Sequence, residues 1–173
     1  GVKLMQANKS SKRSISLIGM AGAGKSTISN ELAKIIDYEI IDSDFFIEKE
    51  YGQSLQNILD NKGYLRLREI EEDILLKINF NKIILSTGGS AIYSNKAMNY
   101  LMDNSIVFFL DVPFDQIIER VKNFSARGFA KSPNQTIKDA FEERKCLYEK
   151  YSHHLINNSF DVDSCVKKIL ELI

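Results

Sequence analysis

The stretch Gly19-Met20-Ala21-Gly22-Ala23-Gly24-Lys25-Ser26-Thr27 decides the fold of this chain. It has the pattern G-x-x-x-x-G-K-S of a P-loop, the phosphate-binding turn that joins a strand to a helix. An apolar run at residues 15–18 precedes it and a helix-compatible run at residues 26–36 follows it, which is the context that the motif requires. A glycine-rich turn that binds nothing is the alternative, but a chance match is rare at average glycine usage.

The residue types in this motif predict the chemistry of the site. Gly22, Ala23 and Gly24 would bring backbone N–H groups close to an anion, and the N-terminus of the next helix would point at it. Lys25 would neutralise the β- and γ-phosphates of a nucleotide, and Ser26 would ligate Mg²⁺. We therefore predict that the chain binds a nucleotide.

Length, composition and charge narrow the class of protein. The chain has 173 residues, enough for one domain, and its 44% apolar and 27% charged residues are typical of a globular protein. Lysine plus arginine and aspartate plus glutamate number 23 each, so no basic field indicates nucleic acid. The apolar runs are too short to span a membrane, and the polar start does not resemble a signal peptide. Cys146 and Cys165 are not at metal-ligand spacing, so we expect reduced thiols and a cytoplasmic protein. From the balanced charge and the short apolar runs, we expect no nucleic-acid or membrane partner.

Strand and helix patterns alternate along the chain. Apolar runs predict strands at residues 15–18, 38–41, 82–86, 105–110 and 154–156. Helical patterns occur at residues 26–36, 44–51, 55–59, 64–78, 94–102, 113–123, 136–151 and 163–173. This alternation predicts a three-layer α/β fold with a central, mostly parallel five-stranded sheet. We expect a flexible tail at residues 1–13, a single domain at 14–173 and a mobile lid at about 124–134, where the sequence is polar.

Polar residues follow three of the predicted strands, at the edge of the sheet where ligands bind in open α/β folds. Asp42-Ser43-Asp44 follows the second strand, and Asp111 follows the fourth. The polar residues 86–90 begin at the last residue of the third strand. Helix capping is the alternative for the two aspartates, because Asp favours the N-cap position. A cap explains one of these carboxylates but not both, so we predict a functional role for at least one.

Several further motifs carry a resemblance to a known family. The P-loop matches G-M-x-G-x-G-K-S-T, residues 41–52 resemble D-[ST]-D-x-x-I-E…G, and Leu65-Arg66-Leu67-Arg68-Glu69 resembles F-R-x-x-E with leucine in place of phenylalanine. Thr87-Gly88-Gly89-Ser90 resembles T-G-G-G, and Arg144 with Leu147-Tyr148 resembles R-x-P-L-Y. Arg120 and Arg127 match a nucleotide-side and a lid arginine, and Asp163-Ser164-Cys165 resembles an adenine-side loop. Together, and in this order, the motifs make residues 14–173 resemble a shikimate kinase, in the nucleoside-monophosphate-kinase-like branch of P-loop proteins.

The resemblance implies a kinase domain that uses ATP and Mg²⁺ to phosphorylate the 3-hydroxyl of shikimate, and we expect it to be a monomer. The implied catalytic residues are Lys25, Asp44 and Arg127. The implied ATP-binding residues are Gly22, Ala23, Gly24, Lys25, Ser26, Thr27, Arg120, Arg127 and Ser164. The implied substrate-binding residues are Asp44, Arg66, Gly88, Gly89 and Arg144, the two arginines holding the substrate carboxylate. Ser26 and Asp42 would hold Mg²⁺.

The departures from the family pattern leave alternatives open. The lid reads Arg127-Gly128-Phe129-Ala130 where the family has R-P-L-L, and Ser90 and Cys146 replace a glycine and a proline. A related kinase acting on a different hydroxy acid, such as a gluconate-like acid, would fit these changes. A nucleotide acceptor is also open, but it would need a base-binding pocket and phosphate-binding arginines, which the motifs do not indicate. A nucleotide-binding regulatory module is the third reading, but such a module does not need Asp44. Exposed salt bridges are the alternative for Arg66, Arg68 and Arg144; the resemblance favours a substrate role for Arg66 and Arg144 and not for Arg68.

Overall fold

The computed structural model describes residues 13–121 and 129–173. Its centre is a five-stranded sheet in which every paired neighbour is parallel, in the order β2-β3-β1-β4-β5. The strands are β1 (Ser14–Ile18), β2 (Glu39–Asp42), β3 (Ile83–Ser86), β4 (Ser105–Asp111) and β5 (His154–Asn157). The predicted α/β fold with five parallel strands is confirmed.

Strand β1 lies in the middle of the sheet and carries the P-loop at its carboxyl end. Ile15 pairs with Ile84 of β3 on one side and with Ile106 of β4 on the other. All five residues of β1 are buried, because helices cover both faces of the sheet. The order reverses on either side of β1, so the loops after β1, β2 and β3 meet at one edge of the sheet.

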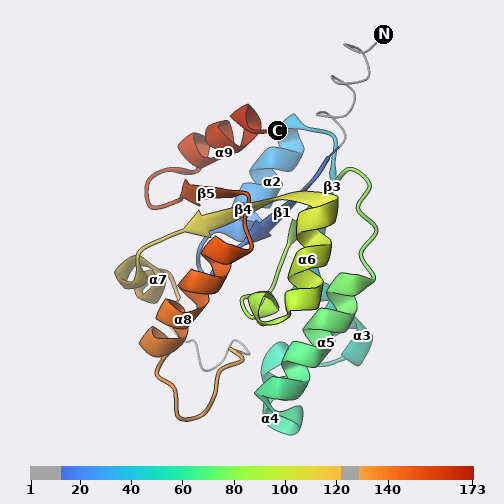
Figure 1. The fold of residues 1–173 in the computed structure, drawn as a ribbon, viewed down its shortest axis with the longest axis vertical. Coiled ribbons are helices and arrows are strands. Elements are labelled where there is room, and N and C mark those ends of the chain that lie inside the picture. The colour runs from blue at the N-terminus through green and yellow to red at the C-terminus, as the bar shows by residue number, and fades with distance from the viewer. Residues whose placement is uncertain (1–12, 122–128) are drawn as a thin grey trace.

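Helices form the outer layers. Among the described residues they are α2 (Lys25–Ile35), α3 (Ser43–Tyr51), α4 (Leu55–Lys62), α5 (Tyr64–Leu76), α6 (Asn95–Asn104), α7 (Phe114–Arg120), α8 (Ile137–Lys150) and α9 (Val162–Glu171), with a 3₁₀ turn η1 (Ala91–Tyr93). Figure 1 shows α2 and α9 together on one side of the sheet, and α5, α6 and α8 on the other. Within residues 13–121 and 129–173, no helix is long and apolar enough to cross a membrane.

Helices α3, α4 and α5 form a smaller packing unit at one end of the molecule (Figure 1). Its core consists of Ile47, Ile58, Leu67 and Ile70, together with Ala130 from the segment after α7. Ala130 is only 2% exposed, so part of the predicted lid is packed against these helices. The rest of that prediction, residues 124–128, lies outside the described residues, as does the tail at residues 1–12.

The predicted element boundaries differ from the structure by a few residues, and local hydrogen bonds explain several of the differences. The helix predicted from Ser94 begins at Asn95, because the Ser94 hydroxyl caps it by accepting from the Ala97 N–H at 3.0 Å. The last helix begins one residue earlier than predicted, with Asp161 as its N-cap. The 3₁₀ turn η1 was not predicted; it follows the Gly88-Gly89-Ser90 turn directly.

Candidate active site

The P-loop encloses the side chain of Lys25. The Lys25 Nζ donates hydrogen bonds to the carbonyl oxygens of Gly19 and Met20, at 2.6 and 2.9 Å. Burial lowers its pKa to about 8, and the nearby carboxylate of Asp44 opposes that shift. Gly24 has a φ of 96°, and a Cβ there would lie 2.5 Å from the Asn158 side-chain nitrogen, so this position requires glycine. The loop therefore brings an ammonium group and close-packed backbone to the carboxyl end of β1.

Arg120 and Asn158 form hydrogen bonds to backbone carbonyl oxygens of the P-loop. Arg120 donates to the carbonyl oxygens of Gly22 and Asn158, at 3.1 and 3.0 Å. Asn158 is buried, and its side-chain nitrogen donates to the Ala23 carbonyl at 2.7 Å. Arg120 lies where a nucleotide-side arginine is expected, whereas sequence reasoning missed Asn158, which only follows a short strand.

Ser164 does not join this group. It lies in the first turn of α9, where its amide and hydroxyl both donate to the carboxylate of Asp161, at 2.7 and 3.1 Å. Ser164 therefore serves the helix cap, and its predicted contact with ATP stays a prediction. Arg127, predicted as the lid arginine, lies outside the described residues.

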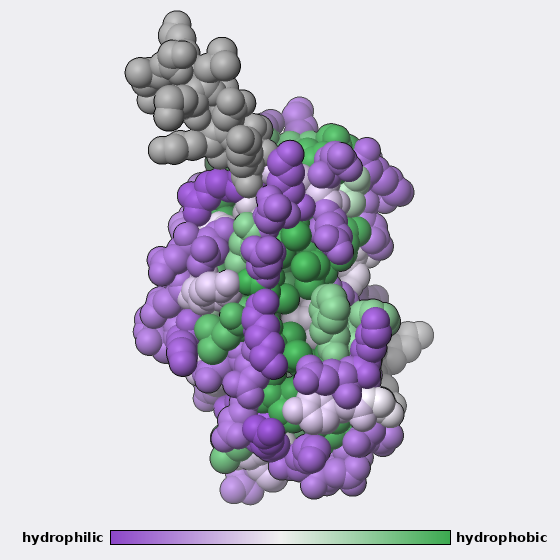
Figure 2. Space-filling view, turned by 90° about the vertical axis from the view of Figure 1, so that its right-hand side faces the viewer, coloured by the Kyte–Doolittle hydropathy of each residue, from purple (hydrophilic) through white to green (hydrophobic). Residues whose placement is uncertain are grey.

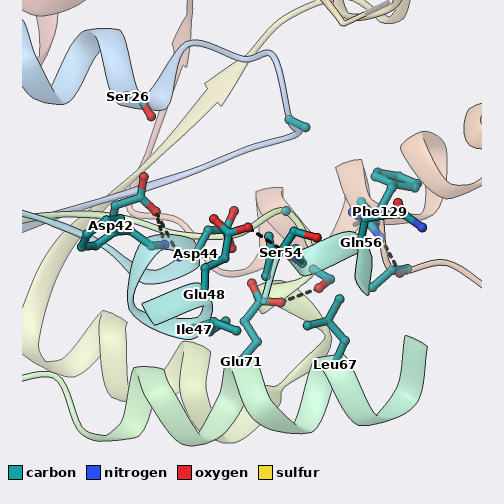
Figure 3. A pocket seen from close by; sticks show the side chains of 17 residues that line it. Ser26, Asp42, Asp44, Ile47, Glu48, Ser54, Gln56, Leu67, Glu71 and Phe129 are labelled. Carbon is teal, nitrogen blue, oxygen red and sulfur yellow. Dashed lines mark hydrogen bonds between the residues drawn. The ribbon is translucent and has the colours of Figure 1, made fainter. Parts of the chain in front are cut away.

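The aspartates after β2 face the start of α2. Asp42 caps α3, because its Oδ1 accepts from the backbone N–H groups of Asp44 and Phe45 at 3.0 and 3.3 Å. Figure 3 shows the carboxylate of Asp42 directed toward the hydroxyl of Ser26. Helix capping thus explains the position of Asp42 but not that of Asp44. This agrees with the expectation that a cap explains one of the two carboxylates and not both.

Two adjoining cavities meet at these residues. One, of about 230 Å³, is lined by the P-loop, including Gly22, Gly24, Lys25 and Thr27. The other, of about 430 Å³, extends toward α4, α5 and α8. Both are lined by Ala21, Ser26, Asp42, Asp44 and Gly89. A phosphate held by the P-loop would therefore face a molecule held in the second cavity across these shared residues.

Asp44 and Glu71 bring two carboxylates to the same point. A Cβ built on Gly88 would lie 2.3 Å from Glu71 Oε1 and 2.5 Å from Asp44 Oδ1. Glu71 is 3% exposed; its Oε2 accepts from the Ser90 hydroxyl at 2.5 Å, and its Oε1 has no hydrogen-bond partner within the described structure. Burial and then the Glu71 charge raise the pKa of Asp44 to about 7, and burial raises the pKa of Glu71. One of these carboxyl groups is thus poised to exchange a proton near neutral pH.

Sequence reasoning did not single out Glu71, although the helix pattern contained a signal. Glu71 lies four residues after the buried Leu67 and three before Ile74, on the apolar face of α5. An ionisable residue at such a position is buried at a cost in free energy, which is characteristic of functional sites.

The arginines predicted to hold the substrate divide between the surface and the cavity. Arg66 lies on the exposed side of α5, in an ion pair with Glu69 at 3.0 Å, and does not line the cavity. Arg144 is 1% exposed, lines the cavity and donates to the Ala130 carbonyl at 2.7 Å. Arg68 donates to the same carbonyl at 3.0 Å. The structure therefore brings Arg68, and not Arg66, beside Arg144.

The positions of Arg66 and Arg68 bear on how the motif F-R-x-x-E aligns with the chain, because it can be placed at residues 65–69 or at residues 67–71. Leu67-Arg68-Glu69-Ile70-Glu71 satisfies the pattern as well as the match two residues earlier. In the later register the leucine is buried, the arginine is half-buried beside Arg144, and the glutamate lines the cavity. The structure supports this register for all three positions.

The two glycines after β3 have different surroundings. The Gly88 N–H donates to the Ser43 hydroxyl at 3.1 Å, so it is already engaged within the protein. Gly89 lines both cavities, and its carbonyl accepts from the Tyr148 hydroxyl at 2.5 Å. Of the pair, Gly89 is therefore the better placed to contact a ligand.

A parallel sheet with a P-loop on its central strand, and an acidic and arginine-lined cavity beside it, defines a P-loop kinase of the small-molecule class. A model of the shikimate kinase family matches residues 21–173. The chain belongs to the shikimate kinase family.

Individual relatives agree with this assignment. The chain is 34% identical over 167 residues to a shikimate kinase of Haemophilus influenzae (strain PittEE), covering 94% of this chain and 93% of the relative. It is 35% identical to one from Sulfurihydrogenibium sp. (strain YO3AOP1), covering 79% and 82%. Among solved structures, shikimate kinase from Acinetobacter baumannii in complex with shikimate has a TM-score of 0.84 at 29% identity and 92% coverage of both chains. Deoxyadenosine kinase from M. mycoides, at a TM-score of 0.55 and 18% identity, shares the fold.

Proposed function

We propose that this chain transfers the γ-phosphoryl group of ATP to the 3-hydroxyl of shikimate. Family membership supports the activity, and a similar solved structure contains shikimate. The observation that carries the proposal is the convergence of Arg68 and Arg144 on the carbonyl oxygen of Ala130, at the cavity that Ala130 and Arg144 line beside the P-loop. Two guanidinium groups side by side suit a planar carboxylate, which each can bind through paired N–H donors. The acceptor is thus a small acid.

The nucleotide would lie along the P-loop. We assign Lys25 to the β- and γ-phosphates, the backbone from Gly22 to Thr27 to the phosphate oxygens, and Arg120 to the nucleotide side. Lys25 would exchange its bonds to the carbonyls of Gly19 and Met20 for phosphate oxygens. Arg127 keeps its predicted role as a lid arginine that stabilises charge on the transferring group.

Mg²⁺ fits the same region. We assign its protein contacts to Ser26 and Asp42, whose oxygens face one another (Figure 3). Two protein oxygens suit Mg²⁺, which keeps several waters and binds through one or two protein oxygens and substrate phosphates. When bound, the ion would neutralise charge on the phosphates.

Asp44 would act as the general base. The acceptor hydroxyl loses its proton to Asp44 as its oxygen forms a bond to the γ-phosphorus, and the bond to ADP breaks. A pKa near 7 suits this role, because the carboxylate is available at neutral pH and still basic enough to take the proton. The unpartnered Glu71 Oε1 is placed to accept from another hydroxyl of the acceptor. Gly89 would offer its backbone to the same molecule.

A panel of acceptors tests the proposal. The purified chain should release ADP from MgATP in the presence of shikimate, and not with shikimate methyl ester at the same concentration. A gluconate-like acid or a nucleoside that reacts faster than shikimate would keep the kinase class and change the acceptor. If the chain binds ATP but transfers no phosphoryl group to any of these compounds, the result would favour a nucleotide-binding regulatory module.

A further inference from the structure

Arg68 and Arg144 are held without the usual partner of a buried arginine. Neither forms an ion pair with a carboxylate among the described residues, and the Nε of each is buried without a hydrogen-bond partner there. Burial, together with the neighbouring charge of Arg144, lowers the pKa of Arg68. Two repelling cations that share one carbonyl oxygen need another contact to keep them in place.

Aromatic rings supply that contact. The Arg68 guanidinium carbon lies 4.9 Å from the centre of the Tyr64 ring and that of Arg144 lies 4.1 Å from the centre of the Phe129 ring, and both guanidinium groups share the ring of Tyr93. The Arg68 guanidinium carbon lies 3.6 Å from the centre of the Tyr93 ring, and that of Arg144 lies 5.4 Å from it. Both distances are within the range in which an aromatic face attracts a cation. Arg68 belongs to α5 and Arg144 to α8, so the Tyr93 ring, at the end of η1, contacts guanidinium groups from two separate helices.

The ring is itself fixed. The Tyr93 hydroxyl donates a hydrogen bond to Glu143, the residue before Arg144, and Glu143 also accepts from the Gln135 side chain at 3.0 Å. Burial and the hydrogen bond to Glu143 raise the pKa of Tyr93, so the side chain stays a neutral phenol. Its aromatic face, and not a phenolate charge, is therefore what the two guanidinium groups meet.

We infer that Tyr93 is a positioning residue that sets the spacing of Arg68 and Arg144 for the carboxylate of the acceptor. The inference rests on the proposed function, since it assumes a carboxylate-bearing substrate. Tyr93 acts through the arginines and does not line the cavity that the substrate would occupy. Its removal should therefore weaken acceptor binding and leave ATP binding and the chemical step unchanged.

Tyr93→Leu removes the ring face, and Tyr93→Phe keeps it while losing the bond to Glu143. We expect Tyr93→Leu to raise the KM for shikimate about tenfold, with kcat and the KM for ATP within about twofold of the native values. Tyr93→Phe should raise the shikimate KM less than about threefold. Tyr100→Leu is the matched control, because Tyr100 is also partly buried but donates to the carbonyl of Ile78, which follows α5, and neither residue lines the cavity.

Tyr93 is only partly buried, so its loss leaves no large core cavity, and Tyr93→Met is the alternative if the leucine variant does not fold. A shikimate KM within twofold of the native value in Tyr93→Leu overturns the inference. So does an equal rise of both substrates' KM values, as expected of a general loss of structure, or an effect of Tyr93→Phe as large as that of Tyr93→Leu. If the native chain does not phosphorylate shikimate at all, the proposed function itself has failed.

Discussion

Arg68 and Arg144 come from different helices, yet both donate a hydrogen bond to the same backbone carbonyl oxygen, at 3.0 and 2.7 Å. That oxygen belongs to Ala130, in the segment predicted as a lid. A carboxylate oxygen can accept the same two bonds, and the second carboxylate oxygen can meet the donors that remain. The shared carbonyl thus marks where two cationic groups converge, and it links the acceptor site to the predicted lid.

Replacing these arginines should weaken binding of the acceptor. Hydrogen bonds with a charged partner contribute roughly 1.5–3 kcal/mol, so Arg68→Ala should raise the shikimate KM about ten- to a hundredfold. Arg144→Lys should have a similar effect, since lysine cannot bind a carboxylate through paired donors. The KM for ATP should stay constant, because neither residue lines the cavity at the P-loop.

Arg66→Ala is the matched control, because Arg66 lies two residues from Arg68 on the same helix and pairs with Glu69 at the surface. It should leave the shikimate KM within about twofold, as expected for an exposed ion pair. A large effect of Arg66→Ala with none from Arg68→Ala would restore the earlier register of the motif.

Lys25→Ala should abolish phosphoryl transfer, because positioning and charge neutralisation account for most of the catalysis in this chemistry. The melting temperature serves as the check on folding. Normal turnover by a folded Lys25→Ala variant would refute the assignment of the P-loop lysine to the phosphates.

Asp44 should impose an acidic limb on the pH profile. With its pKa raised to about 7, the carboxylate is protonated below that pH, so kcat/KM should fall as the pH drops through about 7. Asp44→Asn should lower kcat much more than it changes the KM for ATP. A selective rise of the ATP KM would instead assign Asp44 to the nucleotide side.

The same pKa shift predicts a change in stability with pH. Because the folded chain holds this proton more tightly than the unfolded chain, stability from Asp44 is lost as the pH rises from about 4 to about 7. Asp44→Asn removes this loss, so it should stabilise the chain more at pH 8 than at pH 5, by at least about 1.4 kcal/mol, the value of one pKa unit. Equal effects at both pH values in urea titrations would show that the group is not perturbed.

Gly88→Ala tests the convergence of the two carboxylates. The added methyl group would lie 2.3 Å from Glu71 Oε1 and 2.5 Å from Asp44 Oδ1, so at least one carboxylate must move. We expect kcat to fall at least about tenfold, because small displacements of a catalytic group are costly. An unchanged kcat would mean that the geometry around Asp44 does not matter for transfer.

The sequence predicted the fold well, because the P-loop fixes one strand and one helix, and continuous apolar runs identify the buried strands. Lys25, Asp44 and Arg144 line the two cavities, as their motifs led us to expect, because each belongs to a motif with one possible register. Their roles in the reaction stay predictions. The substrate motif on α5 has two overlapping registers, at Arg66 and at Arg68, and only the direction in which each side chain points separates them.

Other features of the site depend on contacts between segments distant in the sequence. Asn158 reaches the P-loop through a bond to Ala23, a residue 135 positions earlier, and no local pattern indicates that pairing. Tyr93 stacks on arginines from two other helices, so only the folded chain brings it to them.

The product of the reaction with shikimate tests the central claim most directly. Purified chain, MgATP and shikimate should be incubated and analysed by mass spectrometry and phosphorus NMR, with Lys25→Ala as the control. We predict one molecule of shikimate 3-phosphate for each ADP formed, and none with the variant. Shikimate recovered unchanged while the same preparation binds ATP would contradict the account.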